Sequence, residues 1–550
     1  MADSPRFRSL SSMRQRALYF LLFVVVLVPT ACGQENQNDL KVLTVGLEAN
    51  PTHLDPRFSL DVASARVTQL VFNGLLQKDR HSQIVPDLAL RWEQPEPTIY
   101  IFHLRQDVQF HNGQPFTSAD VAYTFRSILD ATLGSPKRGS YQAIQEIETP
   151  DPQTVVFNLK EPFAPFLAQM VAPIVPHQAG REIAHFREHP IGTGPFRFED
   201  FRSDERVELS AYTEYHEGRP RLDRVVYRII PDGTVRRLEL ERGGVDLLVN
   251  ALSPESLEGL ATRPHLKVER APGTNFTYLG FNLQDPILSR PKVRLAFAHA
   301  IDRAAIIQHV LKGLARPAQN LLAETHWAHA EDVATYSYDL DRAHQLLDEA
   351  GLQDPDGPGP EPRFRLVFKT SQNEVRRQVA EVIQAQLQQL GVEVQIRSFE
   401  WGTFFSDIRS GNFQIFALTW VGVLDPDIYH YIFHSSSVPP LGANRGRYLN
   451  PEMDRLLEEG RRLLDLQARK GVYDQVQQIL AQDLPYLSLW HSTHVAVMRK
   501  GVEGFELYPD ESMRTLKDVD LLPGPTTSSS HIGPLADPLC QGCEPLSRPS

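Results

Sequence analysis

The sequence predicts an α/β fold with more than one lobe, and three observations support this expectation. Residues 364–420 alternate between strand and helix patterns, which is typical of a mostly parallel sheet covered by helices. After residue 32, no apolar run approaches the roughly 20 residues of a membrane span. The folded body holds roughly 490 residues, which is long for one hydrophobic core, so two or three lobes are expected.

The N-terminal segment predicts export from the cytoplasm. A basic stretch precedes the short apolar run 17–28, and small residues lead to Cys32, as in a secretory signal peptide. Cys32 directly after Ala31 resembles the lipobox of a bacterial lipoprotein, although Pro29 stands where that motif usually has Leu. We expect residues 1–32 to be a lipoprotein signal peptide, Cys32 to be lipidated and residues 33–40 to form a polar tether. A plain signal peptide is the alternative.

Charge and cysteine content exclude several classes of protein. The net charge of −12 argues against nucleic acid or an anionic membrane as the main partner. Besides Cys32, the chain has only Cys540 and Cys543, so the body contains no disulfide. Their CxxC spacing lies in the Pro- and Ser-rich segment 523–550, without the strand–helix context of a redox motif. We expect this tail to be disordered.

Periodicity and turn residues predict the individual elements of the first half of the body. An alternating pattern predicts each strand, and apolar residues at helical spacing predict each helix. Asp120 adds favourable charge to the first turn of its helix. In chain order, the expected elements are strand 41–47, helix 62–76, strand 99–104, helix 118–129, strand 154–159 and strand 225–230.

The second half has clearer boundaries because glycines close several of its helices. Gly351, Gly391 and Gly411 each follow a helical pattern, as expected of residues just past a helix C-terminus. Asn450 before Pro451 is typical of an N-cap followed by proline at N1. The expected elements are helix 339–350, strand 364–368, helix 374–390, strand 392–396, helix 404–409, strand 413–420 and two helices ending at 464 and 480.

Several motifs resemble one protein family. The run YIFHLRQDVQFHNGQPFTSADVAYTF at 100–125 is similar, almost position for position, to a signature of the family 5 extracellular solute-binding proteins. These are the peptide-, nickel- and oligosaccharide-binding subunits of ABC importers. The similarity extends in family order from about residue 42 to residue 505. The other similar segments are 53–56, 191–196, 278–282, 293–303, 400–401 and 420–426.

The resemblance implies a fold like that of type II periplasmic binding proteins, with two lobes that close on a ligand. Two chain crossings, near residues 270–278 and 487–492, would join the lobes. Lobe I would contain residues 41–270 and 490–520, with an extra subdomain at about 77–188. Lobe II would contain residues 271–489.

The resemblance also implies a ligand site in the cleft between the lobes. Aromatic and polar residues near the crossings and in the cleft-lining segment are the candidates: Asn275, Tyr278, Trp401, Trp420, Asp425, Asp427, Tyr429 and Trp490. Relatives that bind peptides by a free N-terminus often carry Asp three residues after the equivalent of Trp420, whereas this chain has Val423. Either Asp425 or Asp427 substitutes for that carboxylate, or the ligand is not a peptide with a free N-terminus.

The function implied by the resemblance is that of the substrate-binding subunit of an ABC importer, lipid-anchored outside the cytoplasm. It would capture a peptide or similar solute as a monomer and deliver it to permease and ATPase subunits. We expect no enzymatic activity and no cofactor, because the chain has no GxSxG, HExxH or P-loop motif. The alternatives are a sensing receptor, or a binder of a nickel chelate or oligosaccharide. The histidine pairs 326/329, 430/434 and 491/494 lack accompanying acidic or Cys ligands, so we expect no metal site.

Overall fold

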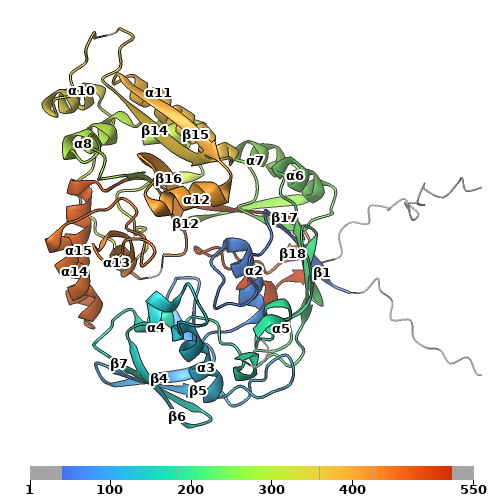
Figure 1. Ribbon diagram of the computed structural model, residues 1–550. Coiled ribbons are helices and arrows are strands. Elements are labelled where there is room, and N and C mark those ends of the chain that lie inside the picture. The colour runs from blue at the N-terminus through green and yellow to red at the C-terminus, as the bar shows by residue number, and fades with distance from the viewer. Residues whose placement is uncertain (1–39, 181–182, 358, 424, 523–550) are drawn as a thin grey trace, which may run out of the picture. The chain divides into compact units, whose positions relative to one another are not determined.

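An 11-stranded mixed sheet runs through the computed structural model, which describes residues 40–180, 183–357, 359–423 and 425–522 (Figure 1). Its strand order is β15-β14-β16-β12-β17-β11-β1-β10-β9-β8, and β13 also pairs with β17. These strands are β1 (Val42–Leu47), β8 (Phe196–Arg202), β9 (Arg206–Ala211), β10 (Arg224–Ile229), β11 (Leu247–Val249), β12 (Leu266–Phe281), β13 (Ala315–Pro317), β14 (Phe364–Ser371), β15 (Val392–Phe399), β16 (Ile415–Trp420) and β17 (Tyr486–Arg499).

The expectation of parallel strands holds for only part of the sheet. β14 is parallel to β15 and to β16, and β1 is parallel to β10 and β11. The long strands β12 and β17 are antiparallel to each other, and β12 is also antiparallel to β16. At the other end of the sheet, β9 is antiparallel to both β8 and β10, so the sheet is mixed at its centre and at this end.

Helices α11 (Glu374–Gln388) and α12 (Trp401–Ser410) pack against β14 and β15 (Figure 1). The glycine positions after both helices are confirmed, since Gly391 and Gly411 have φ values of 73° and 82°. Helix α12 begins three residues before the expected position 404. The Glu400 carboxylate caps it by accepting the backbone N–H groups of Gly402 at 2.7 Å and Thr403 at 3.2 Å.

A separate four-stranded sheet lies within residues 77–188. Its order is β4-β5-β7-β6, formed by β4 (Ala89–Glu96), β5 (Ile99–Leu104), β7 (Thr154–Leu159) and β6 (Ile144–Asp151). Helix α3 (Ser118–Leu129) packs on β6 and β7, and the phenylalanines between them form a distinct core. Asp120 starts α3 as expected, because its carboxylate accepts the backbone N–H of Thr117 at 2.8 Å in a capping box.

One helix in the first half is shorter than its apolar pattern predicts. Helix α2 (Val62–Val71) ends well before residue 76. Gly74 instead forms an isolated bridge with Pro173, and a Cβ at residue 74 would lie 2.7 Å from the backbone oxygen of Val171. The close approach of two backbone segments therefore replaces the last helical turn.

The remaining elements complete the structure. The paired helices after Asn450 are confirmed, with the Asn450 side chain accepting the backbone N–H of Glu452 at 3.0 Å. The other helices are α4 (Phe166–Gln169), α5 (Ile183–Glu188), α6 (Gly233–Glu241), α7 (Pro254–Ala261), α8 (Pro291–Ala300), α9 (Arg303–His309), α10 (Leu340–Glu349), α13 (Ile428–Phe433), α14 (Pro451–Arg462) and α15 (Leu466–Asp483), with 3₁₀ turns η1 (Arg138–Tyr141), η2 (His177–Gly180) and η3 (Arg514–Lys517). The short strands are β2 (Leu76–Lys78), β3 (Ile84–Pro86), β18 (Val502–Glu503) and β19 (Asp520–Leu521).

The terminal segments predicted above lie outside the described residues. These are the signal peptide with Cys32, the tether up to residue 39 and the tail 523–550 with Cys540 and Cys543. Within the described ranges, no helix combines the length and the apolar character that crossing a membrane requires.

Candidate functional site

Aromatic rings from three adjacent strands stack at the centre of the sheet. Tyr278 on β12 is fully buried, and its ring lies parallel to that of Tyr486 on β17, with centroids 3.9 Å apart. On the other side, Tyr278 is parallel to Trp420, the last residue of β16, at 6.4 Å. The strand pairing β16-β12-β17 brings these residues together, because their side chains project from the same face of neighbouring strands.

A buried arginine lies against this stack. Arg445, from the segment between α13 and α14, donates an N–H to the Tyr278 hydroxyl at 2.9 Å. Its guanidinium carbon lies 4.9 Å from the Trp420 ring centroid and 5.3 Å from that of Phe405. Among the described residues, no carboxylate lies within ion-pair distance of Arg445, whose exposed fraction is 8%. Burial lowers the pKa of Arg445, but the neighbouring tyrosines raise it more, so the side chain stays charged.

Trp401 on α12 and Arg376 on α11 continue the contacts that Phe405 and Arg445 make. Trp401 begins the helix, is 47% exposed and stacks on Phe405 with a centroid distance of 5.6 Å. The guanidinium carbon of Arg376, from the start of α11, lies 5.0 Å from the Trp401 ring. Arginine and aromatic side chains thus form one continuous series of contacts, which we call the arginine–aromatic ladder: Arg376, Trp401, Phe405, Arg445 and Trp420.

Both acidic candidates are engaged in ion pairs. The Asp425 carboxylate accepts two N–H groups of Arg469, at 2.8 and 2.5 Å. Asp427 pairs with Arg461, whose Nε lies 2.8 Å from the carboxylate. Burial raises the pKa of Asp427 to about 6 despite the opposing charge of Arg461. Both carboxylates thus already have cationic partners within the protein.

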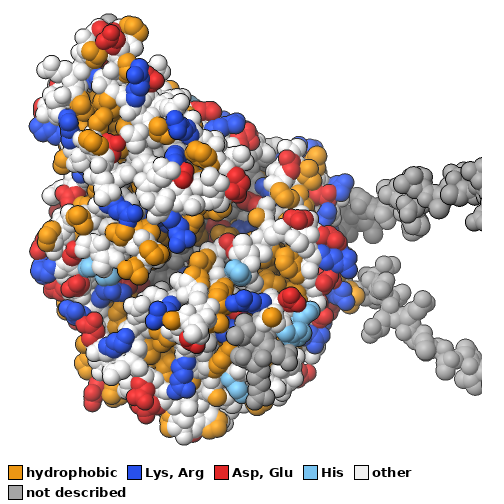
Figure 2. Space-filling view, viewed as in Figure 1, with side chains coloured by type: hydrophobic (Ala, Val, Ile, Leu, Met, Phe, Trp, Pro, Cys, Tyr) orange, Lys and Arg blue, Asp and Glu red, His pale blue; other side chains and the backbone are white. Residues whose placement is uncertain are grey.

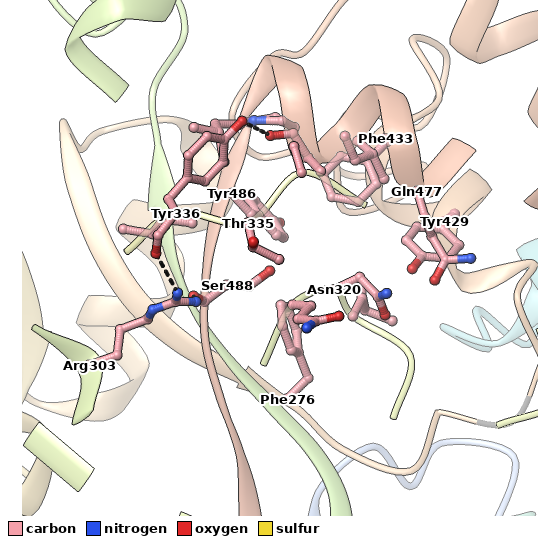
Figure 3. Close-up of a pocket in the computed structure, with 18 residues that line it drawn as sticks. Phe276, Arg303, Asn320, Thr335, Tyr336, Tyr429, Phe433, Gln477, Tyr486 and Ser488 are labelled. Carbon is pink, nitrogen blue, oxygen red and sulfur yellow. Dashed lines mark hydrogen bonds between the residues drawn. The ribbon is translucent and has the colours of Figure 1, made fainter. Parts of the chain in front are cut away.

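Tyr429 lies beside a small, partly open cavity between β17, α13 and α15 (Figure 3). Phe276, Phe433 and Tyr486 form apolar walls, and Asn320 and Gln477 add polar groups. The volume of about 50 Å³ has room for a few water molecules only. Tyr429 itself is 1% exposed. The cavity is thus too small for a peptide.

The other two candidates lie on the long strands and are almost fully buried. The Asn275 side chain on β12 donates to the Glu511 carboxylate at 2.6 Å. Glu511 also pairs with Arg66 at 3.0 Å, so Asn275 belongs to a buried polar network. Trp490 on β17 is 4% exposed and packs in the core formed with α8–α11.

The segment 161–164 contacts the end of α14. The backbone N–H of Ala164 donates to the Arg461 carbonyl at 2.7 Å, and Arg461 lies over the Phe163 ring at 5.1 Å. Arg462 pairs with Glu161 at 2.8 Å. These contacts link residues 77–188 to the helices that follow residue 450.

The histidine pairs lie mainly in ordinary packing environments. The rings of His430 and His434 stack with centroids 4.2 Å apart, and burial lowers the pKa of His430 to about 2. His491 contacts the Asn320 carbonyl at 3.2 Å. Within the described part of the chain, no group of three or more His, Cys, Asp or Glu residues is arranged to hold a metal ion.

The structure places the candidates Trp401, Trp420 and Tyr278 in one region. It adds four neighbours that the sequence analysis did not single out: Arg376, Phe405, Arg445 and Tyr486. Phe405 lies within the helix expected at 404–409, so the sequence predicted its element but not its contacts. No local pattern marks Arg445, because its segment has neither helical nor strand periodicity. Figure 2 shows basic and apolar side chains bordering the hollow in the middle of the face that it presents.

Comparison with known proteins gives consistent matches. Residues 83–439 match the family model for bacterial extracellular solute-binding proteins, family 5 Middle. The oligopeptide-binding protein AppA of Bacillus subtilis is 28% identical over 496 residues, which covers 86% of this chain and 90% of AppA. A probable di/tripeptide-binding protein 5 of Pseudomonas aeruginosa is 30% identical over 500 residues, covering 85% of this chain and 93% of that protein.

Solved structures show the same fold. AppA from Bacillus subtilis in complex with a nonapeptide has a TM-score of 0.79 at 27% identity, covering 88% of this chain and 100% of AppA. NikZ from Campylobacter jejuni in complex with Ni(L-His) has a TM-score of 0.79 at 25% identity, covering 87% of this chain and 99% of NikZ. The type II periplasmic-binding-protein fold expected from the sequence is thereby confirmed.

Proposed function

We propose that this chain, which belongs to the bacterial extracellular solute-binding proteins of family 5, captures a peptide or similar solute outside the cytoplasm and delivers it to an ABC importer. The observation that carries the proposal is the arginine–aromatic ladder at the end of β16 and the start of α12. Its partly exposed aromatic faces can cover a ligand of varied shape, and its arginines supply charge-assisted hydrogen bonds.

The same proposal divides the chain into two lobes. Lobe I contains residues 41–270 and 490–520, with 77–188 as a subdomain, and lobe II contains residues 271–489. Separate hydrophobic cores around β1 and β10, around α8–α11 and within the four-stranded sheet support this division. The long strands β12 and β17 are then the two crossings between the lobes.

Ligand binding is coupled to closure of the lobes in this proposal. The ligand contacts both lobes only in the closed state, so its greater affinity for that state shifts the population towards closure. The contacts of segment 161–164 with Arg461 and Arg462 would then form between lobes on closing. Permease and ATPase subunits are the proposed partners, and ATP is consumed by them.

We further infer that a lipid on Cys32 anchors the protein to the cell envelope. The basic stretch, the apolar run 17–28 and the small residues before Cys32 support this inference. The two acyl chains of a diacylglyceryl group give stable membrane attachment, whereas one acyl chain alone gives only marginal attachment. Metabolic labelling with a palmitate analogue, with Cys32→Ala as the control, tests it; an unlabelled wild-type protein would contradict it.

The test of the proposed function is a ligand screen of the mature chain by thermal shift and calorimetry. The panel contains peptides of two to nine residues, oligosaccharides, nickel chelates and small carboxylates. We expect saturable stabilisation and one-to-one binding by at least one solute, together with a smaller radius of gyration in X-ray scattering. Chemical conversion of a bound solute, or a ligand-bound protein that no permease recognises, would argue for an enzyme or a sensing receptor instead.

A further inference from the structure

The cleft-lining segment offers no free carboxylate to a ligand ammonium. Position 423 is valine, and the next two acids along the chain are engaged, Asp425 with Arg469 and Asp427 with Arg461. Displacing Arg469 would leave a buried guanidinium unpaired, which is strongly unfavourable, and displacing the half-buried Arg461 would break its ion pair with Asp427. A ligand held by its positive N-terminus therefore has no ready partner in this segment.

Among the described residues, the same region contains two arginines with no carboxylate at ion-pair distance, although the charge of Glu48 acts on Arg376 and partly offsets the effect of burial on its pKa. Arg445 is buried, and the single hydrogen bond of its side chain among the described residues goes to the neutral Tyr278 hydroxyl. A guanidinium has five N–H donors, so most of the donors of Arg445 remain available. Arg376 is half-buried and makes one long hydrogen bond, 3.5 Å to the Ser371 hydroxyl. An anion would offset the cost of burying these charges.

The ladder holds both guanidinium groups in defined orientations. Arg445 lies between the rings of Phe405 and Trp420, and Arg376 lies over Trp401, which stacks on Phe405. A guanidinium packed by its flat face on aromatic rings keeps its N–H edge free. That edge matches the two oxygens of a carboxylate, which it can bind in a bidentate manner.

We propose that the arginine–aromatic ladder captures its ligand by a carboxylate, with Arg445 as the primary anchor and Arg376 as the second. This inference rests on the proposed binding function and specifies its ligand class: a solute that presents a carboxylate rather than an ammonium. The carboxylate belongs either to the C-terminus of a peptide or to a non-peptide organic acid, and the experiment separates these sources.

The experiment uses the mature chain and calorimetric titration with tetrapeptide mixtures in four forms: free, N-acetylated, C-amidated and capped at both ends. A set of small di- and tricarboxylic acids forms a parallel arm. We expect N-acetylation to change the affinity less than about threefold and C-amidation to weaken it at least about tenfold, as expected for loss of a charge-assisted bidentate contact. Binding only in the acid arm would identify a non-peptide carboxylate as the source.

Variants connect the carboxylate to the ladder. Arg445→Gln should weaken binding of the free ligand by roughly tenfold or more and bind free and amidated ligands alike. Arg445→Lys keeps the positive charge but lacks the paired N–H donors of a guanidinium, so its affinity should lie between that of the wild type and that of Arg445→Gln. Arg397→Gln, at an exposed arginine on β15, is the matched control and should leave affinity unchanged. Arg376→Gln gives a second test if Arg445→Gln does not fold.

The outcomes distinguish this inference from the proposed function. Binding that requires a free N-terminus but tolerates amidation, or that is unchanged in both folded arginine variants, overturns carboxylate capture while the binding function stands. An absence of binding in every peptide form and in the acid arm overturns carboxylate capture, and the proposed function is overturned with it if the oligosaccharides and nickel chelates of the wider panel do not bind either.

Discussion

Replacing Asp425 by Asn should lower stability without weakening ligand binding. Arg469 would then remain buried beside a neutral amide, although its other contacts persist: Nε donates to the Gly460 carbonyl at 2.8 Å and the guanidinium lies over Trp327 and Tyr473. Breaking one partner of a buried ion pair costs about 3 to 5 kcal/mol. Because the Asp425 side chain is 16% exposed, we expect the lower end, about 3 kcal/mol.

Thermal and urea unfolding measure this effect. If the lobe that contains Asp425 unfolds as one unit, about 3 kcal/mol corresponds to a fall in Tm of roughly 6 to 12 °C. Asp332→Asn, at an exposed carboxylate, is the control and should leave Tm unchanged. The double variant Asp425→Leu with Arg469→Met should recover most of the loss, since an apolar pair of similar volume leaves no buried charge. A wild-type Tm combined with a large loss of peptide affinity in Asp425→Asn would show instead that Asp425 binds the ligand.

Three further predictions address pH, packing and the exposed ladder. Burial lowers the pKa of His111 to about 4, whereas in the unfolded chain this imidazole takes up a proton near pH 6.5. The contribution of His111 to stability should therefore be complete above pH 6.5 and be lost as the pH falls towards 4. In urea titrations at several pH values, His111→Gln should reduce the dependence of the unfolding free energy on pH over this range. A Cβ on Gly273 would lie 2.4 Å from the His494 ring, so Gly273→Ala should lower the free energy of unfolding by about 2 kcal/mol, measured in urea. As a control, Gly259→Ala on an exposed turn of α7 should not lower that free energy. Trp401→Ala should change stability by less than about 1 kcal/mol, because the ring is 47% exposed, but weaken calorimetric ligand affinity by roughly tenfold.

Local patterns predicted the elements whose boundaries depend on local chemistry. Gly391 and Gly411 end helices through positive φ, and Asn450 caps α14 with its side chain. The start of α12 at Trp401 was missed because a Glu N-cap is a weaker sequence signal than Ser, Thr, Asp or Asn.

Long-range features were harder to predict from the sequence. The antiparallel course of β12 and β17 depends on pairing between residues more than 200 positions apart, such as Tyr278 with Ser488. The position of Arg445 depends on Tyr278 and Phe405, which are distant in sequence and become its neighbours only in the folded sheet. The family resemblance supplied the region proposed for the site, but the pairing of Asp425 with Arg469 follows from three-dimensional packing alone.

The place of β17 in the sheet has a consequence for how the chain reaches its folded state. Strand β17 (Tyr486–Arg499) comes late in the sequence, but it lies in the sheet between β12 and β11. The sheet therefore cannot be completed until nearly the whole chain is available. Pairings so distant in sequence carry a large loop-closure entropy and slow the folding reaction. A chain emerging N-terminus first would therefore stay incompletely folded until its last long strand arrives.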